Sequence, residues 1–228
     1  MIRILTLLAL NAPFTCFSVE KFTVLFTAAL VDKKFNERKI EYIASLNRLL
    51  SFGIRPIIVE ACKTSSFFDV YKLPTFYPNV NNLRLQNKGV NEARLLQEAL
   101  KHFQFDDEHL IVKMTGRYLF LDDRFFRLLS SLPSVDFVVR KGPELSSARG
   151  RFIDCFTGCF AAKAKYLREF LDQLDLERME REFTCIEHEL GIFLRENPQI
   201  QVLFVDSLGI RANIFLDGNF SKPHYTYW

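Results

Sequence analysis

The strongest constraint on the fold is a strand-like segment, a helix-like segment and a second strand-like segment that follow one another between residues 21 and 61. KFTVLFTAALV (21–31) is rich in Val, Phe, Leu and Ala, which predicts a buried strand. NERKIEYIASLNRLLSFG (36–53) repeats apolar residues at helical spacing and ends at a glycine, which predicts a helix. IRPIIVEA (54–61) predicts a second strand. This order favours a parallel pair of strands joined by a right-handed crossover.

The alternation continues along the rest of the chain. The predicted strands cover a short segment near 83–85 and then 108–120, 135–141, a segment from 152 through Gly158, and 201–214. The predicted helices cover 89–105, 122–132, the residues up to 174 and 183–197, with loops over 62–82 and 142–151. The chain has 228 residues, of which 49% are hydrophobic, so it can bury one sizeable core. We therefore expect an α/β fold, a single three-layer domain with a mostly parallel sheet.

The N-terminal segment MIRILTLLALNAPFTCFSVEK has the layout of a secretory signal peptide. A lone arginine precedes a short apolar run, and small residues precede a possible cleavage before Val19. The run is shorter than the roughly 20 residues that span a bilayer, and a first strand of the domain is the alternative. We predict a signal peptide over 1–18 and a globular domain over 19–228. The protein would then be exported or enter the secretory pathway, and would be cytoplasmic if the segment is not a signal.

Composition and charge indicate which kinds of partner to expect. The formal net charge is +3, and the sequence has no polybasic tract and no basic helix with interleaved aromatic residues, so we do not expect nucleic acid as the main partner. The later apolar segments are interrupted by charges, so we expect no transmembrane span. The five cysteines lack the spacing of a zinc site, and we expect them to be small buried residues.

Polar residues that directly follow the strands are the candidate ligand contacts, because ligands of open α/β sheets bind beyond the carboxyl ends of the strands. The segment HLIVKMTGRY places Lys113, Thr115, Gly116 and Arg117 at such an end. Lys113 and Arg117 have the same parity on an extended strand and can point to one face. Together they could supply charge-assisted hydrogen bonds to phosphate, and Gly116 would allow close backbone approach. Solvated charges at a strand end are the alternative.

One segment resembles a known enzyme family. LQNKGVNEARLLQEAL, followed by an apolar strand, is similar to the middle of GT-A-fold glycosyltransferases of the family 2 type, which show Asn-x-Gly-x-x-x-Ala at the start of a helix. Asn87, Gly89 and Ala93 match this pattern, and TGCF and CIEHEL follow in the family's order, over roughly residues 21 to 216. The resemblance implies that a sugar is transferred from a nucleotide-diphosphate donor to a hydroxyl of a glycan, lipid or protein. It places Asn87, Lys88 and Gly89 in donor binding.

The sequence departs from the family at the metal site. Where the family has a metal-binding Asp-x-Asp, this chain has KMTGRY, and Lys113, Thr115 and Arg117 cannot replace two carboxylates on a divalent cation. We therefore expect basic residues to hold the diphosphate, with or without Mn²⁺ or Mg²⁺. Asp122 and Asp123 are the candidate metal ligands, and helix capping is their alternative role.

The remaining candidates come from strand ends and from one helix start. The resemblance places the catalytic base at Glu187, which could instead be a favourable charge in the first turn of a helix. Glu60 could accept hydrogen bonds from ribose hydroxyls, and Thr27 could contact the nucleotide. Gly158 could permit close approach of the substrates or form an ordinary turn.

Two other functions fit the same features. The first is a secreted, non-catalytic α/β binding or effector domain that recognises an anionic ligand. The second is an enzyme that makes or cleaves nucleotide sugars on a similar fold.

Overall fold

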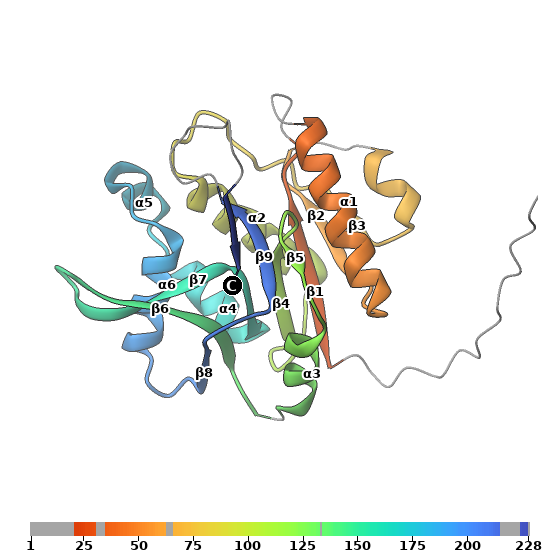
Figure 1. Cartoon of the computed structure of the whole chain (residues 1–228). Coiled ribbons are helices and arrows are strands. Elements are labelled where there is room, and N and C mark those ends of the chain that lie inside the picture. The colour runs from red at the N-terminus through yellow and green to blue at the C-terminus, as the bar shows by residue number, and fades with distance from the viewer. Residues whose placement is uncertain (1–20, 31–34, 63–65, 133, 215–223, 228) are drawn as a thin grey trace, which may run out of the picture.

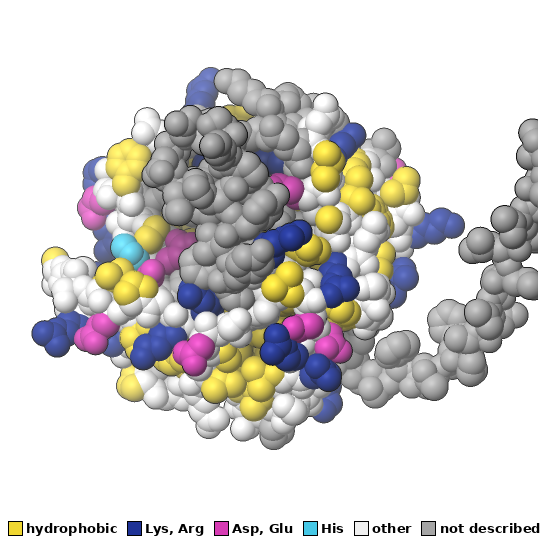
Figure 2. Space-filling model, in the orientation of Figure 1, with side chains coloured by type: hydrophobic (Ala, Val, Ile, Leu, Met, Phe, Trp, Pro, Cys, Tyr) yellow, Lys and Arg dark blue, Asp and Glu magenta, His cyan; other side chains and the backbone are white. Residues whose placement is uncertain are grey.

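The computed structural model describes residues 21–30, 35–62, 66–132, 134–214 and 224–227, and the predicted signal peptide lies outside them. A central sheet carries helices on both faces (Figure 1). No helix in the described part of the chain is long and apolar enough to cross a bilayer. On the face that Figure 2 shows, basic and acidic side chains are interspersed among apolar ones.

The central sheet has seven strands in the order β3-β2-β1-β4-β7-β6-β8. The β3–β2, β2–β1, β1–β4 and β6–β8 pairs are parallel, and β7 is antiparallel to both of its neighbours. The predicted α/β class with a mostly parallel sheet is therefore confirmed. The strands are β1 (Phe22–Ala28), β2 (Ile57–Glu60), β3 (Thr75–Phe76), β4 (Leu110–Thr115), β6 (Phe137–Ser147), β7 (Gly150–Lys163) and β8 (Val202–Val205).

A smaller sheet consists of β5 (Leu119–Phe120), β9 (Ile210–Ile214) and β10 (His224–Tyr227). The prediction of one strand over 108–120 was wrong, because β4 ends in a turn and the chain then enters this second sheet. The amide of Tyr118 donates to the carbonyl of Thr115 (3.0 Å), which closes the turn. The turn keeps the residues after β4 near the carboxyl end of this strand.

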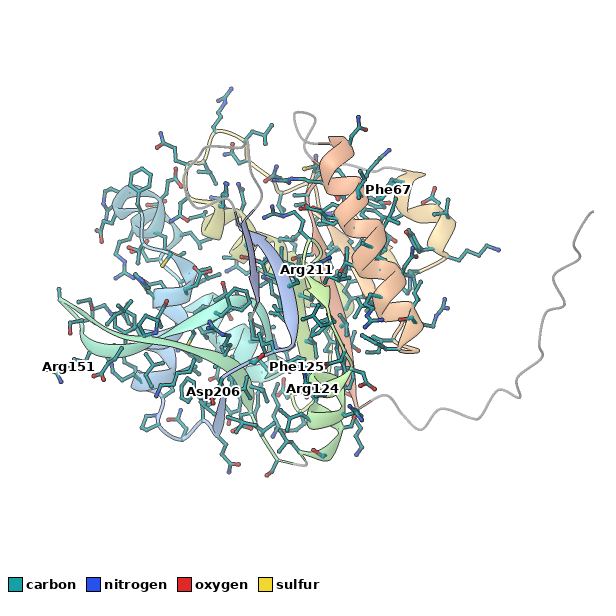
Figure 3. The ribbon with its side chains drawn as sticks, in the orientation of Figure 1. Phe67, Arg124, Phe125, Arg151, Asp206 and Arg211 are labelled. Atoms are coloured by element: carbon teal, nitrogen blue, oxygen red, sulfur yellow. The ribbon has the colours of Figure 1, made fainter. Side chains whose placement is uncertain are left out.

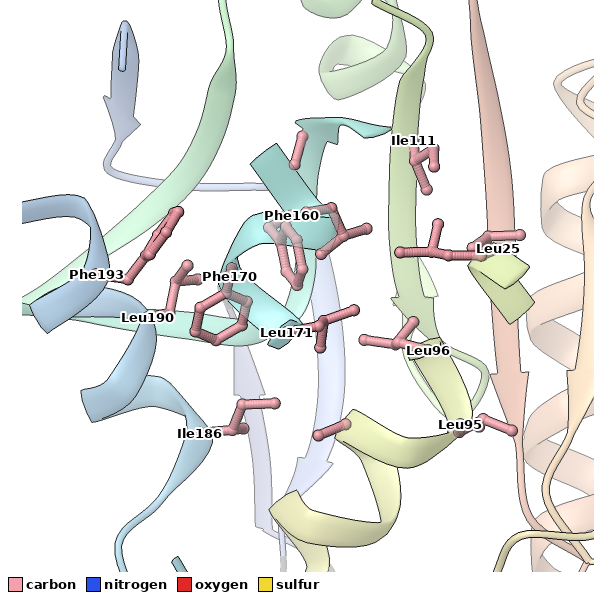
Figure 4. Close-up of a cluster of buried hydrophobic side chains, with 14 of the residues drawn as sticks. Leu25, Leu95, Leu96, Ile111, Phe160, Phe170, Leu171, Ile186, Leu190 and Phe193 are labelled. Atoms are coloured by element: carbon pink, nitrogen blue, oxygen red, sulfur yellow. The ribbon is translucent and has the colours of Figure 1, made fainter. Parts of the chain in front are cut away.

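Helices cover both faces of the central sheet, which gives the three layers. One core cluster joins the sheet to α2, α4, α5 and α6 (Figure 4), and a second joins it to α1, α3 and a 3-10 helix, η2. Alternate residues of β1 supply the two clusters, Leu25 on one face and Phe26 on the other, as strand geometry requires. The helices are α1 (Phe35–Ser51), η2 (Ser66–Tyr71), α2 (Lys88–Phe103), α3 (Arg124–Ser131), α4 (Ala164–Asp172), α5 (Leu176–Glu182) and α6 (Ile186–Glu196).

The predicted polar loop over 142–151 is instead the far part of a long hairpin formed by β6 and β7. Arg151 lies near its tip (Figure 3). Arg149 of this hairpin donates to Glu189 and to Glu196 of α6, at 2.9 Å each. Polar residues are tolerated here because this part of the hairpin projects beyond the core. Its composition is therefore similar to that of a loop.

Three other local predictions were wrong. Residues 83–85 contain a turn rather than a strand, and the edge strand of the sheet is β3. Gly158 lies inside β7, so the ordinary turn, one of the two roles expected for it, is wrong. The helix predicted over 183–197 begins only at Ile186, and α5 precedes it.

Candidate functional site

Lys113 is the centre of a polar group at the carboxyl end of β4. Its side chain is 0% exposed and forms an ion pair with Glu92 of α2. Its ammonium also donates to Thr115 Oγ1 (3.0 Å) and to the carbonyl oxygen of Thr157 (2.7 Å). A buried ammonium is stable only with such partners. Lys113 is therefore neither a solvated strand-end charge nor an open cation that faces a ligand, and both interpretations of the sequence were wrong in this respect.

The partners of Lys113 come from three elements. Pairing of β4 with β7 sets Met114 opposite Cys159, which brings the nearby Thr157 to the carboxyl end of β4. Helix α2 packs on the same face of the sheet and delivers Glu92 from its second turn. The Glu92 side chain is 25% exposed, so one side of the pair reaches the surface.

Thr157 connects this pair to Glu187. Its hydroxyl is buried and donates to Glu187 Oε1 at 2.6 Å, and Glu187 lies in the first turn of α6. We call Glu92, Lys113, Thr157 and Glu187 the carboxylate network. Helix α6 lies very close to β7, since a Cβ added to Gly191 would lie 2.1 Å from the carbonyl oxygen of Ile153. This contact fixes Glu187 relative to the sheet.

Tyr118 and Arg117 follow directly on this network. A Cβ added to Gly158 would lie 2.1 Å from Cε2 of Tyr118, so the glycine makes room for the phenol ring. Burial raises the pKa of Tyr118 to about 12, Arg117 lowers it, and Glu92 and Glu187 raise it further. The phenol is therefore protonated at neutral pH.

Thr27 and Gly116 have structural roles at the junction of β1 and β4. Thr27 is 6% exposed, and its hydroxyl donates to the carbonyl of Met114 (3.2 Å). A Cβ added to Gly116 would lie 2.4 Å from Cε1 of Phe26, so packing against this ring explains the glycine. The predicted contact of Thr27 with a ligand is not supported, because the hydroxyl is buried and used within the sheet.

Glu60 is also buried rather than open at the end of β2. Its side chain is 0% exposed, and Oε1 accepts from the amides of Leu30 (3.0 Å) and Cys62 (2.9 Å). No described residue hydrogen-bonds Oε2, and burial raises the pKa of the carboxyl. Glu60 joins the segments that follow β1 and β2, whereas we expected it at a ligand surface.

Asn87 and Gly89 connect α2 to the two helices α5 and α6. Asn87 caps α2 by accepting from the amide of Gly89 (2.9 Å), and its Nδ2 donates to the carbonyls of Met179 and Thr184 (2.8 Å each). A Cβ on Gly89 would lie 3.3 Å from Cβ of Ile186. The Asn-x-Gly pattern therefore has a complete structural explanation, and the intervening Lys88 is exposed.

Asp122 and Asp123 lie just before α3 and are both paired with arginines. Asp122 accepts from the amide of Arg124 (3.0 Å) and from its Nε (2.8 Å), which lowers the pKa of this carboxyl. Asp123 forms an ion pair with Arg127 (3.1 Å) and makes no side-chain capping bond. Within the described ranges, no cluster of three or more His, Cys, Asp or Glu side chains could hold a metal ion.

The structure joins Thr115 to Glu187 through Lys113 and Thr157, places Gly158 against Tyr118, and leaves Asp122 and Asp123 outside the carboxylate network. Sequence analysis missed Glu92. A lysine inside the apolar run LIVKM was the available signal, because it requires an acidic partner on a neighbouring element. Nothing in the sequence identified Thr157 as a link to Glu187.

Comparisons with known proteins give a likeness of fold only. No protein-family model matches the sequence, and no curated protein matches it. The fold is similar to that of a solved structure described as a glycosyltransferase involved in the glycosylation of the major capsid of PBCV-1, with a TM-score of 0.46 and 10% sequence identity. The match covers 81% of each chain. A likeness of this size does not establish a common activity.

Proposed function

We propose that the protein is a glycosyltransferase that moves a sugar from a nucleotide-diphosphate donor to a hydroxyl of a glycan, lipid or protein. The observation that carries this proposal is the position of Glu187, a carboxylate fixed by Thr157 beside the Lys113–Glu92 pair at the carboxyl edge of the sheet. Polar groups beyond the carboxyl ends of strands are where α/β folds bind ligands.

Glu187 has the properties of a base for the acceptor hydroxyl. The Thr157 hydroxyl has a single proton and donates it to Oε1, so this oxygen is an acceptor and the carboxylate is held in one orientation. The side chain is only half-buried, which leaves Oε2 to receive a proton from an acceptor. A positioned base of this kind contributes roughly 10²- to 10⁴-fold to a rate.

Arg117 and Lys88 are the proposed contacts of the diphosphate, because Lys113 is already used. Arg117 is half-buried and has no ion pair or hydrogen bond within the part of the chain that the structure describes. Lys88 is exposed at the first residue of α2, where the helix dipole also favours phosphate. Lys88 lies one turn before Glu92 on α2, so both point toward the same side of the helix.

The residues at the expected metal position do not fit a divalent cation. Lys113 is itself a cation, Thr115 accepts a hydrogen bond from it, and Glu92 is its counter-ion. Asp122 and Asp123 are paired with Arg124 and Arg127. The proposal therefore assigns charge neutralisation to the basic side chains.

One observation favours the alternative, a non-catalytic binding or effector domain. Lys113 is fully paired inside the protein, and Thr157 and Glu187 bond to each other, as in networks that only stabilise a fold. In that case Glu187 would be a structural contact between α6 and β7, and its neutral isostere would leave every ligand-dependent signal unchanged.

The test is a thermal-shift panel of nucleoside diphosphates and nucleotide sugars, with and without Mn²⁺, followed by an assay of nucleoside diphosphate release. A ligand at 100 times its dissociation constant stabilises the folded state by about 2.7 kcal/mol, which is easily seen. Glu187→Gln should bind the active nucleotide sugar normally and release the diphosphate at least about 100-fold more slowly. Glu177→Gln, an exposed first-turn acid of α5, is the matched control. No nucleotide-dependent shift, or full activity of Glu187→Gln, would refute the proposal.

A further inference from the structure

Helix α1 is apolar on its outer side as well as on its inner side. Its inner side packs on the core through Tyr42, Leu46 and Leu49. On the outer side, Ile40 is 70% exposed and Ile43 is 39% exposed. Residues three positions apart on a helix lie on one face, one turn from each other. The two isoleucines therefore form an apolar strip that the core of the protein does not use.

The 3-10 helix η2 lies beside this strip and extends it. The Phe68 ring of η2 lies 6.1 Å from the Tyr42 ring, and the Lys39 ammonium of α1 lies 5.0 Å from the centroid of the Phe67 ring. Residues three positions apart in a 3-10 helix are eclipsed, so Val70 lies one turn after Phe67 on the same side of η2. Val70 is 77% exposed. Figure 2 shows the result, which is a group of hydrophobic side chains over α1 and η2.

Basic side chains lie beside these apolar ones. Lys39 stands over the Phe67 ring, and the exposed Lys72 directly follows η2. The carbonyl of Lys72 accepts from the guanidinium of Arg55 (3.2 Å), which is also exposed. Cations are thus present at both ends of η2. We call the following residues the α1–η2 surface: Lys39, Ile40, Ile43, Arg55, Val70 and Lys72.

The segment that forms this surface also carries the net positive charge of the chain. Residues 31–72 contain eight basic and five acidic residues, a formal net charge of +3, which equals that of the whole sequence. One of the five acids, Glu60, is buried and does not contribute to the surface. The acidic residues of α1 and η2 are Glu37, Glu41 and Asp69. The charge of this segment therefore complements an anionic partner.

The kinds of side chain indicate which anionic partner fits. The centres of protein–protein interfaces are enriched in aromatic residues and arginine and depleted in lysine, and valine and leucine are rare among their strongest contacts. The α1–η2 surface instead presents aliphatic side chains, two of them more than two-thirds exposed, with lysines beside them. Protruding apolar side chains with adjacent basic residues suit the boundary between lipid headgroups and acyl chains.

We propose that the α1–η2 surface docks the protein on an anionic lipid bilayer. Ile40, Ile43 and Val70 enter the acyl-chain boundary, and the three basic side chains contact the lipid phosphates. Helix α1 covers the face of the central sheet opposite to α2 and α6, so the bilayer lies away from the helices that carry Glu92 and Glu187. The docking does not depend on the proposed function, because it involves no residue of the carboxylate network.

Co-sedimentation of the full chain with vesicles tests the proposal. The vesicles consist of phosphatidylcholine alone or of an equimolar mixture of phosphatidylcholine and phosphatidylserine. We expect the wild type to bind the mixed vesicles and to bind phosphatidylcholine far more weakly. Ile40→Gln/Val70→Gln should lower the partition coefficient on the mixed vesicles at least about 10-fold, because two aliphatic side chains no longer leave water. Lys39→Gln/Lys72→Gln should lower it about 5-fold for each lysine removed.

Two matched controls lie outside the α1–η2 surface. Leu83→Gln changes a leucine that is 79% exposed in the segment before α2, and Lys101→Gln changes an exposed lysine of α2, on the opposite face of the sheet. Both should partition as the wild type does. All the changed apolar side chains are exposed, so each variant should keep the wild-type Tm, which confirms that it is folded.

Each other outcome overturns the proposal. If the wild type does not bind the mixed vesicles, no such docking exists. If Ile40→Gln/Val70→Gln binds them as well as the wild type, the contact with lipid lies elsewhere in the chain. If the wild type ignores vesicles but dimerises in analytical ultracentrifugation, and the same variant is monomeric, the partner of this surface is a second copy of the chain. Nucleotide binding and diphosphate release are measured without vesicles, so their failure would refute the proposed function alone.

Discussion

Replacing Lys113 by methionine removes the ammonium of the carboxylate network while keeping a long, flexible side chain of similar volume. Lys113 is 0% exposed and donates to Thr157 (2.7 Å) and Thr115 (3.0 Å), besides its ion pair with Glu92. The substitution leaves Glu92 without its counter-ion and the Thr157 carbonyl without this donor. Both groups must then be solvated or remain unpaired.

The expected loss of stability follows from the burial of the two partners. Removing one member of a buried ion pair costs roughly 3–5 kcal/mol, and the lower end applies here because the Glu92 side chain is 25% exposed and water can reach its carboxylate. At about 2–4 °C per kcal/mol for a chain of this size, Lys113→Met should lower Tm by roughly 6–12 °C. Glu92→Gln retains an oxygen that can accept from Lys113, so its cost should be about 1–2 kcal/mol.

Urea unfolding followed by far-UV circular dichroism measures both changes, with the slope m as a check that the unfolded state is unaltered. The double variant should be less destabilised than the sum of the single variants by at least about 1 kcal/mol, because the two residues interact. Lys101→Met is the matched control, since Lys101 pairs with Glu98 on the surface of α2, the helix that carries Glu92. This substitution should not change the unfolding free energy measurably. Wild-type stability of Lys113→Met, or strict additivity, would refute the buried ion pair.

Three further predictions concern other parts of the fold. Gly158→Ala should destabilise the protein by about 1–3 kcal/mol, because the new Cβ overlaps the Tyr118 ring. In thermal unfolding, the double variant Gly158→Ala/Tyr118→Ala should recover part of the Tm lost by Gly158→Ala, and an unchanged Tm of Gly158→Ala would contradict the close contact. The pKa of Glu60 is raised, so the folded state binds more protons than the unfolded state, and the stability of the wild type relative to Glu60→Gln should fall as pH rises through the folded-state pKa. A difference in unfolding free energy that does not change with pH would contradict this. Arg149→Met leaves the buried Glu189 with Arg178 as its one described ion-pair partner, so amide exchange in the β6–β7 hairpin should become faster; unaltered exchange would mean that backbone pairing alone fixes the hairpin.

Sequence patterns predicted the elements whose apolar residues repeat regularly. The helix expected over 36–53 is α1, and the strands expected over 21–31 and 54–61 contain β1 and β2, because burial on one or both faces imposes the period of each element. The outer part of the β6–β7 hairpin, residues 142–151, was predicted as a loop because it is exposed and carries no such period. Arg149 and its acidic partners hold it, and such pairs leave no periodic pattern in the sequence.

The candidate site was only partly predictable for a related reason. Lys113 was identified by its position at a strand end, and Glu187 by the resemblance, which places a base near the start of a late helix. The contacts that define their roles join residues far apart in the chain: Thr157 lies 44 positions from Lys113 and 30 from Glu187. In the sequence, Glu92 does not differ from the other acidic residues on helices. Only the packing of α2 against the sheet makes it the partner of Lys113. For Gly158 the sequence offered close approach of the substrates or an ordinary turn, because the ring that needs its space lies far away in the chain.

The sequence by itself determined the alternation of strands and helices, and with it the α/β class and the edge of the sheet where polar residues gather. These properties depend on periods of two and 3.6 residues and on short-range geometry, which neighbouring residues encode directly. Only the tertiary structure decided that Lys113 is an internal counter-ion, that Thr157 orients Glu187, and that Tyr118 stands over Gly158. Whether a charge is buried and paired depends on the elements that pack against it. Here these elements are α2, which precedes β4 in the chain, and β7 and α6, which follow it.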